Sequence, residues 1–147
     1  MRLQTDFELQ QFVAGDPNCV GLNLAGRNIS DAGMAYLENL SLLAVLSLHD
    51  CIRITDAGLR HIVGLTKLKW LILRGCNITD AGLRAVGKLT QLQVLNLHGC
   101  AQITDIGLRE LAGLTKLVRL LLNECPRITD IAVAVFENQH PACEVMR

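Results

Sequence analysis

The sequence has few aromatic residues, no excess of one charge and no long apolar run. Only 3% of its 147 residues are aromatic, so its core must be built from aliphatic side chains. It has 14 basic and 14 acidic residues, so no net field would attract nucleic acid or an anionic membrane. No stretch reaches the roughly 18 consecutive apolar residues of a membrane-spanning helix, and the first residues lack the apolar run of a signal peptide. We therefore expect a cytoplasmic protein that binds neither nucleic acid nor membranes.

Leucine is abundant instead, with 27 copies among a chain that is half hydrophobic. A chain of this length corresponds to one domain. Within it, Ile-Thr-Asp or Ile-Ser-Asp recurs every 24 or 25 residues, starting at Ile29, Ile54, Ile78, Ile103 and Ile128. A fixed period of this size is typical of stacked repeat proteins. We therefore predict a single repeat domain that spans 1–147.

Each repeat combines a short strand with a helical segment. Leu71 and Leu73 are one example of a leucine pair that precedes each Ile-Thr-Asp, and their spacing of two puts both on one face of a strand. Leu59, Ile62 and Leu65 follow at intervals of three, which indicates a helical segment. The intervening Thr and Asp favour the first turn of a helix. Because such a unit cannot bury its apolar face alone, the units must stack with parallel strands into a right-handed solenoid.

Two further positions recur on the helical segment. Glycine stands two residues after each Asp, except that the last repeat has Ala132. Glycine is a poor helix former, so we interpret it as a site where an adjacent coil approaches closely. Arginine recurs four residues after Asp, at Arg60, Arg84 and Arg109. This spacing predicts ion pairs on the helix surface between each Asp and its Arg.

The repeat resembles a known family. Leu43-x-x-Leu46-x-Leu48-x-x-Cys51 is followed by Ile54-Thr55-Asp56-x-Gly58-Leu59, which is similar to leucine-rich repeats of the cysteine-containing subtype. The arrays of F-box leucine-rich repeat proteins are the nearest likeness, although Gly64-Leu65-Thr66-Lys67-Leu68 looks more like bacterial leucine-rich repeats. The resemblance implies an α/β horseshoe segment with parallel strands on the concave face and helices on the convex face. The expected parts are an N-terminal half-repeat at 5–19, repeats at 20–42, 43–67, 68–91, 92–116 and 117–141, and a partial strand at 142–147.

The six cysteines do not indicate a metal site or a catalytic site. Four of them occupy the same repeat position, so they form a linear ladder, which cannot close a tetrahedral zinc site. We expect them to be buried, reduced thiols, with Cys19 and Cys143 more accessible. The pair His98 and Cys100 suggests a nucleophile, but strand alternation places the two side chains in different environments. The sequence also lacks a phosphate-binding glycine loop and a Gly-x-Ser-x-Gly nucleophile elbow. We therefore predict no enzyme activity, no cofactor and no metal.

The sheet positions between the core leucines vary from repeat to repeat. Register places Trp70 on the middle strand, facing solvent beside Ile72 and Arg74, and Gly75 and Gly99 are expected to leave room there. Tryptophan and arginine are enriched in binding hot spots. We therefore predict a non-enzymatic module that binds a protein or peptide on its concave face. The predicted contact residues are Val45, Ser47, His49, Trp70, Ile72, Arg74, Val94, Asn96, His98, Arg119, Leu121 and Asn123.

Narrower roles remain open. The F-box likeness implies substrate recognition for a ubiquitin ligase, but about 15 residues precede the first strand, fewer than we expect for an F-box segment. A bacterial adaptor, or an effector that acts in a host cytosol, is an alternative. A structural role is another, in which the chain self-assembles through its convex face or its exposed last strand. Unpaired edge strands favour such pairing, so weak homo-oligomerisation through the C-terminal edge is expected in that case.

Overall fold

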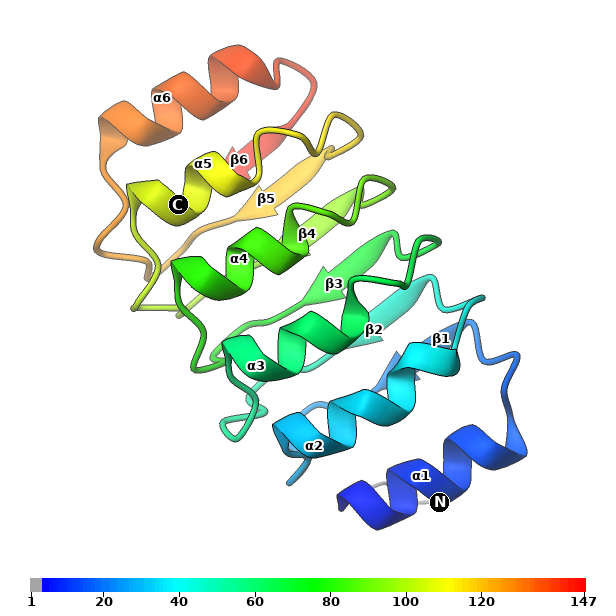
Figure 1. Ribbon diagram of the computed structural model, residues 1–147. Coiled ribbons are helices and arrows are strands. Elements are labelled where there is room, and N and C mark those ends of the chain that lie inside the picture. The colour runs from blue at the N-terminus through cyan, green and yellow to red at the C-terminus, as the bar shows by residue number, and fades with distance from the viewer. Residues whose placement is uncertain (1–3) are drawn as a thin grey trace.

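The leucine pairs form a sheet of six parallel strands that follow one another in chain order. The computed structural model describes residues 4–147. Helices cover one side of the sheet and leave the other open (Figure 1). The strands are β1 (Gly21–Asn23), β2 (Val45–Ser47), β3 (Trp70–Ile72), β4 (Val94–Asn96), β5 (Arg119–Leu121) and β6 (Glu144–Met146). The predicted α/β solenoid is confirmed, with β6 completing the strand expected at the C-terminal end.

The helical half of each coil is short in the middle of the chain and longer at both ends. The helices are α1 (Asp6–Gly15), α2 (Asp31–Met34), α3 (Asp56–Leu59), α4 (Asp80–Val86), α5 (Asp105–Glu110) and α6 (Asp130–Gln139). In two coils the 3-10 segments η1 (Ala35–Asn39) and η2 (Arg60–Ile62) continue the helix. No helix within residues 4–147 is long and apolar enough to cross a membrane.

The core is a ladder of identical positions. The central strand leucines Leu46, Leu71 and Leu95 are fully buried and lie opposite one another in neighbouring strands. The cysteines at the shared repeat position are buried and unpaired, as predicted. Each of these thiols donates to a carbonyl of the preceding coil, and Cys76 Sγ lies 3.0 Å from Leu48 O. Burial raises the pKa of the Cys76 thiol to about 12, so it is protonated at neutral pH.

The terminal cysteines are less accessible than the sequence suggested. Cys19 and Cys143 are only 6% and 9% exposed. Both lie against the outer coils, where Cys19 Sγ donates to Gly21 O at 3.2 Å. These two cysteines are slightly more exposed than the other four, which are at most 4% exposed, as predicted, but all six are buried.

The predicted helix caps are present, but the aspartates have a different role from the one expected. Thr104 caps α5 by accepting a hydrogen bond from the amide of Ile106. Asp80 of the preceding coil accepts hydrogen bonds from Thr104 N at 2.8 Å and Thr104 Oγ1 at 2.6 Å. The same contact joins Asp6 to Ser30, Asp31 to Thr55, Asp56 to Thr79 and Asp105 to Thr129. These five contacts form a ladder that ties each coil to the next.

This ladder overturns the predicted ion pairs between Asp and Arg within one helix. The aspartates point toward the next coil, and Arg84 instead pairs with Glu110 of the following coil at 3.3 Å. In residues 4–147, Arg60 and Arg109 form no ion pair with the preceding Asp. The cross-coil hydrogen bonds of the carboxylates explain why the i, i+4 spacing was misleading.

The recurring glycine lies where two coils approach, as predicted. A Cβ placed on Gly82 would lie 2.5 Å from Asp56 Oδ1, which is too close for a real contact. The glycine therefore makes room for the ladder carboxylate. A second glycine position follows β1, β3 and β4, with Asp50 and Glu124 in its place after β2 and β5. There the reason is backbone conformation: Gly75 has a φ of +68°. The idea that Gly75 leaves room beside the concave patch was wrong, because Asp50 Oδ1 already lies against it.

Candidate binding surface

The open face of the sheet places the predicted contact residues in rows that cross the strands. Trp70 lies directly opposite Val45 on one side and Val94 on the other. Its side chain is 49% exposed, so the indole faces solvent between two partly buried valines. The alternation of buried and outward positions within each three-residue strand fixes this placement. The middle strand thus presents an aromatic side chain at the centre of the concave face.

A second row runs parallel to the first, two residues further along each strand. Its members from β2 to β5 are partly buried and include two large apolar side chains, Ile72 and Leu121. Met146 of β6 extends this row and is exposed. The sequence analysis missed Met146, although its spacing from Leu121 equals one repeat. The full second row is Asn23, Ser47, Ile72, Asn96, Leu121 and Met146.

Polar side chains border this apolar area beyond the C-terminal ends of the strands. His49 Nε2 lies 3.1 Å from Asp50, and His98 Nε2 lies 3.3 Å from Glu124. Arg74 stands between these two pairs in chain order and, within residues 4–147, forms no ion pair. Its exposed guanidinium is available to a partner. Asn123 continues the same border, whereas Arg119 lies in the first row and pairs with Glu144 at 3.1 Å.

The histidine and cysteine positions do not form a nucleophile site. Cys100 Sγ donates to Leu73 O in the core at 3.2 Å, while His98 contacts Glu124 on the open face. The strand therefore separates the two side chains, as the sequence predicted. No cluster of three or more potential metal ligands occurs in the part of the chain that the structure describes.

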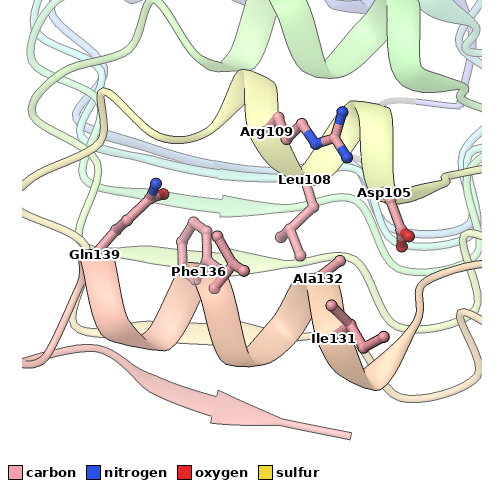
Figure 2. Close-up of a pocket in the computed structure, with 8 residues that line it drawn as sticks. Asp105, Leu108, Arg109, Ile131, Ala132, Phe136 and Gln139 are labelled. Atoms are coloured by element: carbon pink, nitrogen blue, oxygen red, sulfur yellow. The ribbon is translucent and has the colours of Figure 1, made fainter.

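A second surface feature lies on the convex side, between α5 and α6. It is a groove whose floor contains Leu108 and Phe136, which point toward one another from the two helices (Figure 2). The sequence analysis missed it, but a signal was present. The residue after the ladder Asp is alanine in three repeats and becomes Ile106 and Ile131 in the last two. Both isoleucines are exposed.

Comparisons with known proteins agree with this geometry. A family model of leucine-rich repeats in two copies matches residues 66–110. No curated protein matches the chain. An internalin structure from Listeria monocytogenes is 28% identical with a TM-score of 0.73, and the match covers 91% of this chain and 36% of that one. Together with the repeats and the solenoid, these matches show that the chain has the leucine-rich repeat fold.

Two other solved structures share the fold. The yeast complex of Rad7 and Elc1 contains a chain that is 20% identical with a TM-score of 0.76, covering 97% of this chain and 39% of that one. A second Listeria monocytogenes internalin is 24% identical with a TM-score of 0.65, covering 99% of this chain and 66% of that one. At these sequence identities, the similarity shows a shared fold alone. The chain therefore spans roughly two fifths or less of the length of the first two structures and about two thirds of the third.

Proposed function

We propose that this protein is a non-enzymatic module that binds a protein or peptide on its concave face. The observation that carries the proposal is Trp70, half exposed between Val45 and Val94 on the middle strand. An exposed tryptophan in an apolar setting has a large area to bury and little conformational freedom to lose on binding. Arg74, just beyond the C-terminal end of β3, adds a charge without an ion pair among residues 4–147, and this charge sets the orientation of a partner. Leucine-rich repeat proteins are generally interaction modules, which supports this class.

The other predicted contact residues have supporting roles in this proposal. Ile72 and Leu121 widen the apolar centre, while Asn96 and Ser47 offer polar groups between them. A polar border around an apolar centre is the usual anatomy of a protein interface. His49, His98, Arg119 and Asn123 form part of that border, and Val45 and Val94 flank the indole.

A substrate-recognition or adaptor role is the narrower form of this proposal. The Rad7 structure, solved with Elc1, is a leucine-rich repeat neighbour in complex with a protein, and the internalins are the bacterial neighbours. We propose a cytoplasmic location, including a host cytosol if the protein is a secreted effector. The six unpaired cysteines support a reducing setting.

The sole tryptophan gives a direct test. Because the chain has one Trp, its fluorescence reports on occupancy of the concave face. Peptides selected for binding from a display library, or proteins captured from lysate and then purified, should shift Trp70 emission and protect it from acrylamide quenching. Trp70→Ala combined with Arg74→Glu should weaken binding of the same ligands by at least about 100-fold, the loss of two hot-spot residues. The thermal midpoint should stay nearly unchanged.

A matched double variant provides the control. Phe7→Ala with Arg60→Glu removes one exposed aromatic ring and reverses one exposed arginine on the helical side. Binding should remain at the wild-type level in this variant. If the concave variant still binds its ligands and the control does not, the binding site lies on the helical face instead.

A further inference from the structure

The groove between α5 and α6 arises at the one repeat where alanine replaces the ladder glycine. In the earlier coils, a Cβ at this position would collide with the Asp of the preceding coil. A Cβ built on Gly107, for example, would lie 2.3 Å from Asp80 Oδ1. Ala132 carries that Cβ, so the first turn of α6 cannot sit against the Asp105 carboxylate as Gly107 sits against Asp80, although Asp105 still accepts from Thr129 N at 2.7 Å. The cap also changes, because Thr129 accepts from the amide of Ala132, three residues on, whereas Thr104 accepts from Ile106, two residues on. The opening therefore lies beside Ala132.

The groove is apolar at its floor and along one wall. Leu108 and Phe136 form the floor, and the α6 wall contains Val135 and Ile131, which are 52% and 79% exposed. Phe136 is held in place by His140, whose ring stacks on it with centroids 4.1 Å apart. Both ring nitrogens of His140 lie 3.1 Å from backbone carbonyls. The floor is thus rigidly positioned rather than free to collapse.

The size of the groove suits one side chain. Its cavity volume is about 120 Å³. A dry engineered cavity of about 150 Å³ lined by similar side chains takes up benzene. The groove is also open to solvent at the convex surface, where the exposed Ile131 lies. A large aliphatic or aromatic side chain of a partner can therefore enter it from outside.

The charges around the groove favour an anion beside that side chain. Asp105 and Arg109 both line the groove. Asp105 is already engaged, since it accepts hydrogen bonds from Thr129 N at 2.7 Å and Thr129 Oγ1 at 2.9 Å. Arg109 forms no ion pair within residues 4–147, unlike Arg84 at the same position of the previous coil, which pairs with Glu110. The hydrogen bonds from Thr129, and after them the charge of Arg109, lower the pKa of the Asp105 carboxyl. The groove therefore combines an apolar floor with a guanidinium that forms no close ion pair within residues 4–147.

We propose that the α5/α6 groove is a second binding site, which receives an apolar side chain of a partner protein with a carboxylate next to it. The apolar floor of Leu108 and Phe136 binds the side chain, and Arg109 pairs with the carboxylate. This site is separate from the concave face. The leucine core and the sheet lie between the helices that form the groove and the open face of the sheet (Figure 1).

Three small probes of one size test the proposal: 3-phenylpropionate, 3-phenylpropan-1-ol and 3-phenylpropylamine. Each is titrated into the intact protein and followed by NMR of the methyl groups of Leu108, Ile131 and Val135. At typical ligand efficiencies, binding should be roughly millimolar. The propionate should bind at least about threefold more tightly than the alcohol, the gain expected of one exposed ion pair, and the amine should bind most weakly. Equal binding of all three, or shifts confined to other methyl groups, would overturn the proposal.

Matched variants locate the site. Arg109→Gln should remove the preference for the propionate, whereas Arg84→Gln, the same change one coil earlier, should leave it intact. Ala132→Gly should let α6 move toward α5 and lower binding of all three probes several-fold without loss of folding. Unchanged binding in Ala132→Gly would show that the alanine does not open the groove. Trp70 emission should not respond to the probes, so failure here is distinguishable from failure of the concave-face proposal.

Discussion

At the scale of single residues, Glu124 occupies a backbone conformation that most residues avoid. Its φ is 58°, at a repeat position where other coils have Gly75 and Gly99. Its carboxylate lies near His98, but the Glu124 side chain is largely exposed, so the pair contributes little. We predict that Glu124→Gly is more stable than Glu124→Ala by about 1 kcal/mol, because both lose the carboxylate and only glycine relieves the strain. Urea denaturation checks this, and equal stabilities would mean that the turn is unstrained.

The core thiols predict a loss of stability in alkali. Burial raises the pKa of Cys76 and of Cys100 to about 12, from 9.0 in the unfolded chain. The unfolded state therefore releases these protons first, so their stabilising contribution is complete below pH 9 and is lost as the pH rises toward 12. Each thiol should lower the free energy of unfolding by about 1 kcal/mol per pH unit above 9.

Other groups also titrate in that range, so the comparison must be made between variants. Cys76→Ala should be less stable than the wild type at pH 8, yet its stability should fall less steeply between pH 9 and 11. Urea unfolding at several pH values measures both slopes. Parallel slopes for the two proteins would show that Cys76 ionises as readily in the folded state as in the unfolded one.

At the scale of elements, the aspartate ladder predicts a strong difference between two residues of the same type. Asp80 accepts two short hydrogen bonds from Thr104 of the next coil. Hydrogen bonds to charged groups contribute about 1.5–3 kcal/mol to stability. Their loss would also leave the backbone amide of Thr104 without its acceptor. We predict that Asp80→Ala lowers the free energy of unfolding by about 2–3 kcal/mol, as measured by urea denaturation.

Asp130 provides the comparison, because it stands at the same repeat position and no further coil follows it in the structure. Among residues 4–147 its carboxylate pairs only with Arg147, and its side chain is almost fully exposed. Asp130→Ala should therefore change stability by less than about 0.5 kcal/mol. A similar cost for the two substitutions would mean that helix capping, rather than the link between coils, explains why aspartate recurs.

The sequence predicted the elements well and their mutual contacts only in part. Strand register followed from the leucine pairs, and the exposure of Trp70 followed from alternation, because both depend on spacing within one repeat. The aspartate ladder could not be predicted in this way. Asp80 and Thr104 are 24 residues apart, and the local spacing favours Arg84 as the partner of Asp80. The groove beside Ala132 was missed for a related reason, as one methyl group acts there through the packing of two coils.

At the scale of the whole molecule, each coil contacts only the coils next to it. The sheet follows chain order from β1 to β6, and no strand pairs with a distant one among residues 4–147. The free energy of unfolding of such an array is approximately the sum of the intrinsic stability of each coil and the interaction energy between neighbouring coils. An interior coil is therefore held from two sides and a terminal coil from one. The proposed contact residues around Trp70 lie on interior coils, which are held from both sides.

That difference predicts how the array unfolds. Leu95 is fully buried between Leu71 and Leu120 of the flanking strands, whereas Leu22 of β1 has a neighbour on one side only. Leu95→Ala should cost about 2–5 kcal/mol and should unfold the whole chain in one transition. Leu22→Ala should instead release the terminal coil first.

Two optical signals distinguish these outcomes. Circular dichroism reports on every helix, whereas the fluorescence of Trp70 reports on the middle strand alone, since the chain has no other tryptophan. In urea, the two signals should change together for Leu95→Ala. For Leu22→Ala, circular dichroism should change at a lower urea concentration than fluorescence, because the terminal coil unfolds while β3 remains folded. Coincident curves for Leu22→Ala would mean that coupling between coils exceeds the stability of each coil, so that the proposed binding surface cannot persist once either end is lost.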